Sequence, residues 1–240
     1  MSLQAYVLGL GDDALVTAQR IGEWIARAPQ LEEDVALGNI ALDQIGQARS
    51  LLSYAGSLDD PPRTEDDLAY FRDERDFLNV QLVERANGDF ATTIVRLLAF
   101  ATYQCELYAA LMDCPDETVA AVAAKAVKEV DYHRDHAAQW TLRLGDGTEE
   151  SHGRMVAALE AEWPYVDELF APWADALVAP ESLRPAFDAR VAGVLDEATL
   201  AVPDVAPAVT GGRRGIHTEQ MGYLLAEMQH LARSHPGVTW

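Results

Sequence analysis

Helical periodicity runs through nearly every long segment of the 240-residue chain, and this feature limits the possible folds more than any other. Apolar residues recur three and four positions apart, whereas almost nothing alternates with the period of two that is typical of a half-buried strand. Prolines and glycines divide the periodic segments from one another. The sequence therefore predicts an all-α protein.

The prolines and glycines between the periodic segments predict where each helix begins and ends. We expect long helices over residues 12–28, 31–55, 90–112 and 117–144, and shorter ones over 67–84, 149–170, 183–201 and 217–233. Long helices joined by tight turns favour an antiparallel bundle. We predict one domain over residues 1–240, with additional C-terminal helices after the long pairs. The proline- and glycine-containing connection over 202–215 is predicted to be mobile or ordered by a partner.

The charge of the chain excludes some partners. Eighteen Lys and Arg against 39 Asp and Glu give a formal net charge of −21. Such a charge repels phosphate backbones and anionic lipid, so we expect no nucleic-acid and no membrane partner.

Other features of the sequence concern its compartment. No apolar run approaches the roughly 18 residues of a membrane span, and the N-terminus lacks the basic region of a signal peptide. Cys105 and Cys114 form no CxxC pair. We therefore expect a cytoplasmic, reduced protein.

The stretch KEVDYHRDH, residues 128–136, raises the question of a metal site. Di-iron sites in helical bundles take one Glu from each of two helices and a Glu-x-x-His from each of the other two. The first pair of predicted long helices offers Glu23 and Asp43. Three residues after Asp43 stands Gly46, which has no side chain and cannot supply the nitrogen ligand. No histidine precedes His133, so none substitutes.

The second helix pair offers Glu106 and Glu129. Tyr132 stands three residues after Glu129, and His133 comes one position late, although residues four apart still share a helix face. A lysine at position 125 or 128 lies within a turn of Glu129 and could replace a metal as the counter-charge. The stretch is thus either half of a metal site or a salt-bridged and solvated helix face, and we favour the second interpretation.

Two strict Glu-x-x-His matches occur elsewhere, Glu149 with His152 and Glu227 with His230. Six histidines among 39 acidic residues make about one such match by composition alone, so the motif carries little weight. Glu149 also stands at a predicted helix start, where a carboxylate is favoured by the helix dipole.

Long stretches of the chain resemble one known family. The sequence is similar to the C subunits of bacterial phenylacetyl-CoA epoxidases over almost its whole length. The stretches that carry the resemblance are LGDDALVTAQRIGEWI, LEEDVALGNIALDQIGQARSLL, TEDDLAYFRDERDF, NGDFATTIVR, LGDGTEESHGRM and HTEQMGYLLAEMQHLARSHPG.

This resemblance implies a ferritin-like helical fold and a structural role without a cofactor in this chain. It implies a partner, the catalytic A subunit, whose di-iron centre epoxidises the aromatic ring of phenylacetyl-CoA. It also implies an O₂- and NADPH-dependent monooxygenase complex with a reductase subunit that carries FAD and an iron–sulfur cluster. The aromatic pieces Tyr70-Phe71, Trp163 to Trp173 and Trp240 are candidates for the subunit interface or for the core.

Two other functions remain open at this point. The chain could be an active di-iron oxidoreductase that uses Glu23, Asp43, Glu106, Glu129 and His133. It could also be a stand-alone helical protein that binds CoA or an aromatic ligand.

Overall fold

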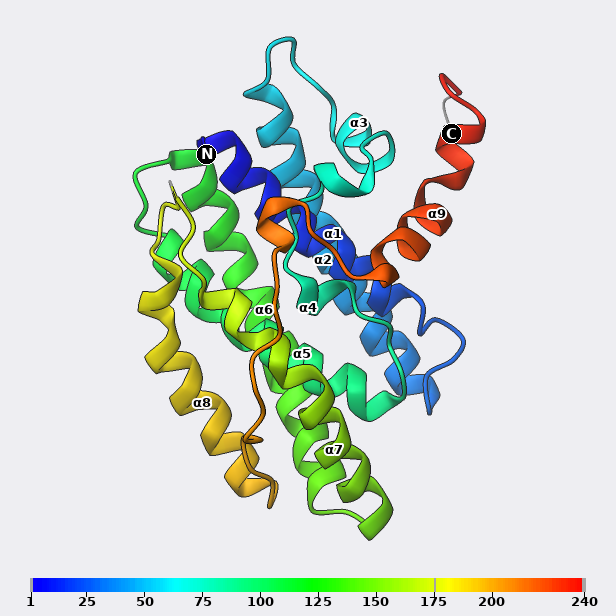
Figure 1. Ribbon diagram of the computed structural model, residues 1–240, viewed down its shortest axis with the longest axis vertical. Coiled ribbons are helices and arrows are strands. Elements are labelled where there is room, and N and C mark those ends of the chain that lie inside the picture. Colours follow the sequence, from blue (N-terminus) through cyan, green and yellow to red (C-terminus); the bar gives the residue numbers. More distant parts are fainter. Residues whose placement is uncertain (1, 175, 239–240) are drawn as a thin grey trace. The chain divides into compact units, whose positions relative to one another are not determined.

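The computed structural model describes residues 2–174 and 176–238 and separates into two compact units. Unit 1 comprises the described residues of Met1–Arg27, Leu31–Ala86 and Thr210–Trp240, and unit 2 comprises those of Ala28–Gln30 and Asn87–Val209. The described residues form helices, turns and one isolated bridge between Gly211 and Ile216, without a strand (Figure 1). The predicted all-α class is confirmed, whereas the single domain over 1–240 stays a prediction.

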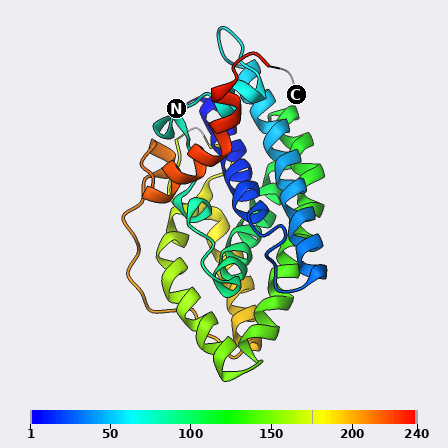
Figure 2. The ribbon, with the colours of Figure 1, turned by 90° about the vertical axis from the view of Figure 1, so that its right-hand side faces the viewer.

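Two long helices that pack along each other dominate unit 1. They are α1 (Leu3–Gly22) and α2 (Leu31–Ser57), and Figures 1 and 2 show them side by side. The expected start of the first helix at residue 12 is wrong, because Ser2 caps α1 and the apolar run that follows is part of its buried face. The expected end at residue 28 is also wrong, since α1 ends at Gly22 and Ile25, which follows it, is exposed.

The helix expected over residues 67–84 is broken. It is replaced by α3 (Glu65–Tyr70), a short 3₁₀ turn (Glu74–Asp76) and the single turn α4 (Gln81–Glu84). The backbone N–H groups of Leu78 and Val80 donate to side-chain carboxylates of α1, at 2.9 Å each. A helix would direct these donors to its own carbonyls, so the tertiary contact prevails over local helix propensity.

Helix α5 (Phe90–Leu111) is the centre of unit 2. Three helices pack against it: α6 (Glu117–Gly145), α7 (Glu149–Glu162) and α8 (Arg184–Glu197). Asp89 caps α5 by accepting from the amide of Thr92 at 3.0 Å. The long helices predicted at 90–112 and 117–144 are confirmed within one residue at each end. Helix α7 ends before the predicted residue 170, since Pro164 opens a 3₁₀ segment over Trp163–Phe170.

Helix α5 also corrects an expectation about apolar length. By length and composition it could cross a membrane, contrary to the prediction that no segment approaches such a span. In the structure, however, 83% of its most apolar 18-residue window is buried, as in a core helix of a folded protein. Its apolar character is thus accounted for by packing within unit 2.

The connection after α8 has two different parts. Residues 201–209 form no regular structure and are mostly exposed. From Gly211 onward the chain is anchored in unit 1, and α9 (Glu219–Ser234) follows. A Cβ at Gly212 would lie 2.0 Å from the Asn79 carbonyl oxygen, and Gly215 has a positive φ of 69° close to the Arg75 carbonyl. The expected mobility is therefore not supported for residues 211–215.

This close approach generates a prediction. Replacement of Gly212 by Ala forces the Asn79 loop to move, so we expect the free energy of unfolding to fall by about 1–3 kcal/mol. The matched control is Gly193→Ala in α8, where an added Cβ meets nothing within 4 Å and helix propensity favours Ala by about 1 kcal/mol. Urea unfolding measures both variants. Equal effects of the two substitutions would contradict the structural account.

Candidate functional site

The predicted ligand positions of unit 1 do not form a ligand set. Glu23 follows the end of α1, and its Oε1 accepts from Arg20 Nη1 at 2.7 Å. Asp43 is half-buried in α2. Above Gly46 there is open space, because an added Cβ would meet no atom within 4 Å. This half therefore offers carboxylates without a nitrogen ligand.

The predicted positions of unit 2 lie on α5 and α6. Glu106 is half-buried, and Glu129 Oε1 lies 3.7 Å from Nζ of Lys125, an exposed lysine four residues earlier on the same helix. That this lysine replaces a metal as the counter-charge stays a prediction. Tyr132 points outward with 51% of its surface exposed, whereas His133 is fully buried. The side chains at 132 and 133 thus face different surroundings, and Tyr132 is not directed at a buried site.

Among the described residues there is no group of three or more His, Cys, Asp and Glu with the geometry of a metal site. The two Glu-x-x-His pairs do not change this. The Nδ1–H of His152 donates to the Gly145 carbonyl at 2.8 Å, which commits that nitrogen to the backbone, and His230 is exposed. That this chain holds no metal remains a prediction.

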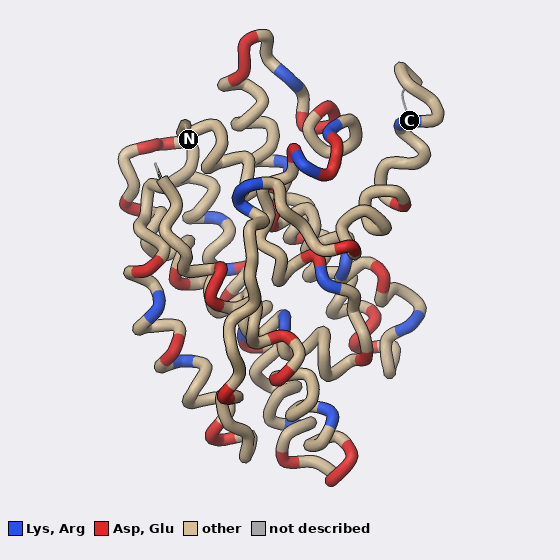
Figure 3. Tube along the Cα trace, in the orientation of Figure 1, with Lys and Arg blue, Asp and Glu red and all other residues tan. Residues whose placement is uncertain are grey.

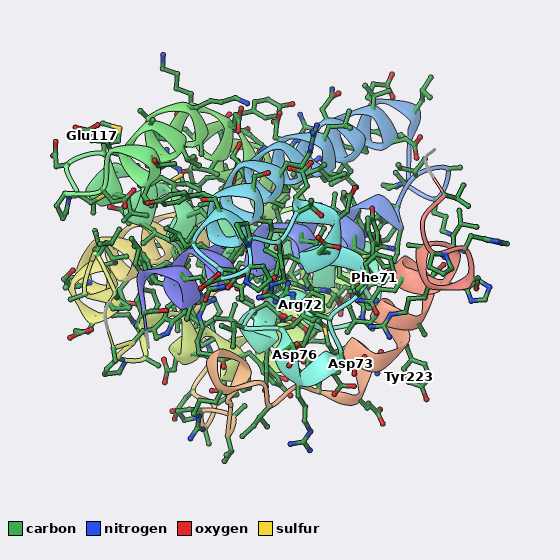
Figure 4. The ribbon with its side chains drawn as sticks, turned by 90° about the horizontal axis from the view of Figure 1, so that it is seen from above. Phe71, Arg72, Asp73, Asp76, Glu117 and Tyr223 are labelled. Atoms are coloured by element: carbon green, nitrogen blue, oxygen red, sulfur yellow. The ribbon has the colours of Figure 1, made fainter. Side chains whose placement is uncertain are left out.

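Sequence reasoning missed an ionic network inside unit 1. Asp12 and Asp13 are buried on α1, in the middle of an apolar helix. Arg72 Nη1 and the amide of Leu78 donate to Asp12 Oδ2 at 3.0 and 2.9 Å, and Arg72 Nη2 pairs with Oδ1. Figure 4 shows the Arg72 side chain directed inward among the elements of unit 1, while Tyr223 of α9 lies at the edge.

The neighbouring aspartate holds the segment before α9. Asp13 Oδ2 accepts from Arg213 Nη2 at 2.6 Å, and Arg213 Nη1 donates to the carbonyls of Gly9 and Leu78 at 3.0 and 2.9 Å. Burial raises the pKa of Asp13 to about 6, although Arg213 and the Val80 amide oppose that change. One arginine thus ties α1, the loop after α3 and the segment before α9 together.

A second buried pair closes the same segment. The Nδ1 of His217 donates to Glu84 Oε2 at 2.6 Å, and its Nε2 donates to the Phe77 carbonyl at 3.0 Å. Because a carboxylate and a carbonyl only accept, this pair of partners favours the imidazolium form of His217, in which both ring nitrogens carry protons. Glu84 also accepts from Asn79 at 2.8 Å and from the Thr218 amide. The Glu84 carboxylate is therefore satisfied from three sides.

The sequence does contain a signal for this network. In LGLGDDALV two adjacent carboxylates interrupt an apolar run, and such residues are rarely buried without a partner. The sequence-based prediction instead begins the first helix at residue 12 and assigns these carboxylates no partner. The partners, Arg72 and Arg213, are 60 and 200 residues away, so nothing local identifies them.

Breaking the first pair should destabilise the protein strongly. Asp12→Asn keeps the shape but leaves the buried Arg72 without its counter-charge, so we expect a loss of about 3–5 kcal/mol in the free energy of unfolding. The control is Asp131→Asn, which removes an exposed pair with Arg134 on α6 and should cost about 1 kcal/mol or less. Chemical denaturation measures the free energy of unfolding of both variants. Similar losses would show that the buried Asp12–Arg72 pair stabilises the protein no more than an exposed pair does.

The His217 pair predicts a pH dependence. Burial alone would lower the pKa of His217, but the hydrogen bond to Glu84, its negative charge and the Phe77 carbonyl outweigh burial and raise the pKa above 6.5. A raised pKa in the folded state stabilises the protein fully below pH 6.5, and that stabilisation is lost as the pH rises through the folded pKa. The raised pKa of Asp13 makes the free energy of unfolding decrease as the pH rises from 3.8 to about 6, which is below this window.

We therefore expect the free energy of unfolding of the wild type to decrease from pH 6.5 to pH 9. His217→Gln retains a donor but does not titrate, so its stability should lack that component. The measurement is urea unfolding at several pH values in this range. Parallel curves for the two proteins would refute the role of His217.

The cysteine of α5 is unsuited to nucleophilic chemistry. Burial raises the pKa of the Cys105 thiol to about 11. The thiolate, which is the reactive form, is therefore scarce at neutral pH.

An open groove lies on unit 1 and has a volume of about 530 Å³. Its walls come from α1, α2, α3 and α9, and its lining is mainly apolar, including Leu15, Gly22, Gly38, Leu42, Ile45 and Met228. Tyr70 also lines it, so one of the aromatic residues proposed for an interface is at this surface. Phe71 is exposed, Trp173 is buried, and Trp240 lies outside the described residues.

The all-α fold of the described residues, with long paired helices, agrees with a helical protein of the ferritin-like class. A family described as "Phenylacetic acid catabolic protein" matches residues 1–240. The chain belongs to this family. It is also 46% identical over 248 residues to the C subunit of 1,2-phenylacetyl-CoA epoxidase from Escherichia coli (strain K12), with 99% of each chain covered. The resemblance seen in the sequence is thereby confirmed.

Proposed function

We propose that this chain is a structural, non-catalytic subunit of a cytoplasmic, multicomponent phenylacetyl-CoA epoxidase. In this role it pairs with the catalytic di-iron subunit and stabilises it. The similarity to the C subunit of such an epoxidase along the whole chain supports a place in this kind of complex. FAD and an iron–sulfur cluster would belong to the reductase subunit, and none of these cofactors to this chain.

The composition at the ligand positions is the observation that carries the non-catalytic role. Glycine at position 46 supplies no donor atom, and the exposed Tyr132 stands where the second histidine would be expected. Lys125 lies 3.7 Å from Glu129, close enough to pair with that carboxylate. Carboxylates without nitrogen ligands and with a lysine partner suit an ion-paired remnant better than an oxygen-activating centre.

Metal analysis of the separated subunits tests the proposal. When this chain and the catalytic subunit of the same organism are co-expressed, we expect them to co-elute in size-exclusion chromatography, with the iron on the catalytic subunit. This chain expressed alone with added iron should hold well under one iron per chain. Two tightly held irons per chain would identify an active di-iron protein. A homo-oligomer of this chain that does not bind the second subunit would indicate a stand-alone binding protein.

A variant separates the catalytic and structural roles. Glu129→Gln removes the carboxylate charge, and we expect epoxidase turnover per assembled complex to stay within about twofold of wild type because no reacting atom depends on it. Lys125→Gln is the control that removes the other member of the ion pair. Loss of turnover in Glu129→Gln alone, with the complex still assembled, would favour the active di-iron alternative.

A further inference from the structure

One face of α2 is apolar and exposed to solvent. Leu31, Val35, Leu42 and Ile45 are all exposed, Leu31 at 74% and Leu42 at 65%. Together with Gly38 they are spaced four, three, four and three residues apart, which places them within an arc of about 80° at 100° per residue. We call these five residues the α2 ridge. A surface helix of a self-sufficient protein carries polar residues on its outer face, so a continuous apolar ridge marks a contact surface.

Two glycines, one in the ridge and one on the neighbouring helix α1, also indicate a contact surface. Gly22 of α1 and Gly38 of α2 line the groove of about 530 Å³ that lies along the ridge. A Cβ at either position would meet no atom within 4 Å, so the packing of this chain does not require glycine there. Glycine within a helix costs about 1 kcal/mol relative to alanine. The absence of side chains leaves room for another backbone to approach closely.

The charge of the chain identifies the kind of occupant. Each chain carries a formal net charge of −21, and acidic residues are spread over the described elements (Figure 3). The surroundings of the ridge and groove include the exposed Glu32 and Asp66, while Arg49 at the rim is paired with Glu65 at 2.8 Å. A second copy would bring like charges together, which opposes association. A different chain with basic residues beside an apolar face is complementary.

We propose that the α2 ridge and the adjoining groove receive an amphipathic helix of a second, less acidic subunit, apolar along one face and flanked by Lys or Arg. This inference rests on the proposed function, since it assigns the surface through which the pairing with the catalytic subunit occurs. Leu42 and Ile45 enter the apolar face of that helix, and the glycines at 22 and 38 let its backbone approach α1 and α2.

Substitutions on the ridge test the assignment. The dissociation constant of each variant with the purified catalytic subunit is measured by calorimetry. Leu42→Lys should raise it about tenfold or more, because a buried charge meets an apolar and basic surface. Leu42→Glu should raise it less, since the carboxylate meets basic flanks. Tyr223→Glu, at the equally exposed Tyr223 of α9 (71%), is the matched control and should leave the constant within about twofold.

A second pair of variants fills space without adding charge. Gly38→Leu should weaken binding about tenfold, whereas Gly193→Leu, at a helical glycine of α8 with equally open surroundings, should not. Because both positions are open, the thermal unfolding of each unbound variant should stay at or above that of wild type. This measurement shows that weakened binding does not come from misfolding.

The outcomes separate this inference from the proposed function. A tight wild-type complex that all ridge variants retain places the interface elsewhere and overturns the inference alone. A stronger effect of Leu42→Glu than of Leu42→Lys overturns the basic character of the occupant. Dimers of this chain that Leu42→Lys disrupts identify a second copy as the occupant and overturn the inference. No complex between the wild-type subunits overturns the proposed function and the inference with it.

Discussion

The neutralisation of two adjacent buried carboxylates is the constraint on which unit 1 depends. Asp12 and Asp13 lie inside an apolar helix, where an unpaired charge would be very unfavourable. Arg72, Arg213 and two backbone amides satisfy them. The chain after α3 is not continuously helical, because its amide groups donate to these carboxylates. The segment before α9 passes close to that loop. The same requirement explains the glycine at 212, where any side chain would collide with the Asn79 carbonyl.

This network is distinct from the positions that the sequence suggests as metal ligands. The positions that the sequence suggests for metal ligands on α2 and α6 include Gly46 and the exposed Tyr132, and Glu129 lies 3.7 Å from Lys125. The unusual features of the outer surface lie instead on α2, where apolar side chains meet solvent beside a groove. These exposed apolar side chains are the basis for the proposal that the chain acts through a partner subunit.

Much of the fold was predictable because long helices carry strong local signals. The ends of α5 and α6 follow from Asp89, the Asp113-Cys114-Pro115 turn and the glycines near 145, all of which act within a few residues. The prediction failed for α1, where an apolar run was separated from its own helix, and for residues 67–84. In the second case the deciding bonds run from Leu78 and Val80 to α1, more than 60 residues away. Local propensity contains no information about such partners.

The helical class, the positions of α5 and α6 and the lack of a donor at Gly46 follow from the amino-acid sequence, since periodicity, capping residues and side-chain chemistry are local properties. The sequence also carried the family resemblance. The three-dimensional structure was needed to show that Asp12 and Asp13 are buried and that Arg213 and His217 hold the segment before α9. It was also needed to show that Leu42 and Ile45 are exposed beside a groove. Burial and ion pairing depend on residues brought together from distant parts of the chain, so a one-dimensional pattern cannot specify them.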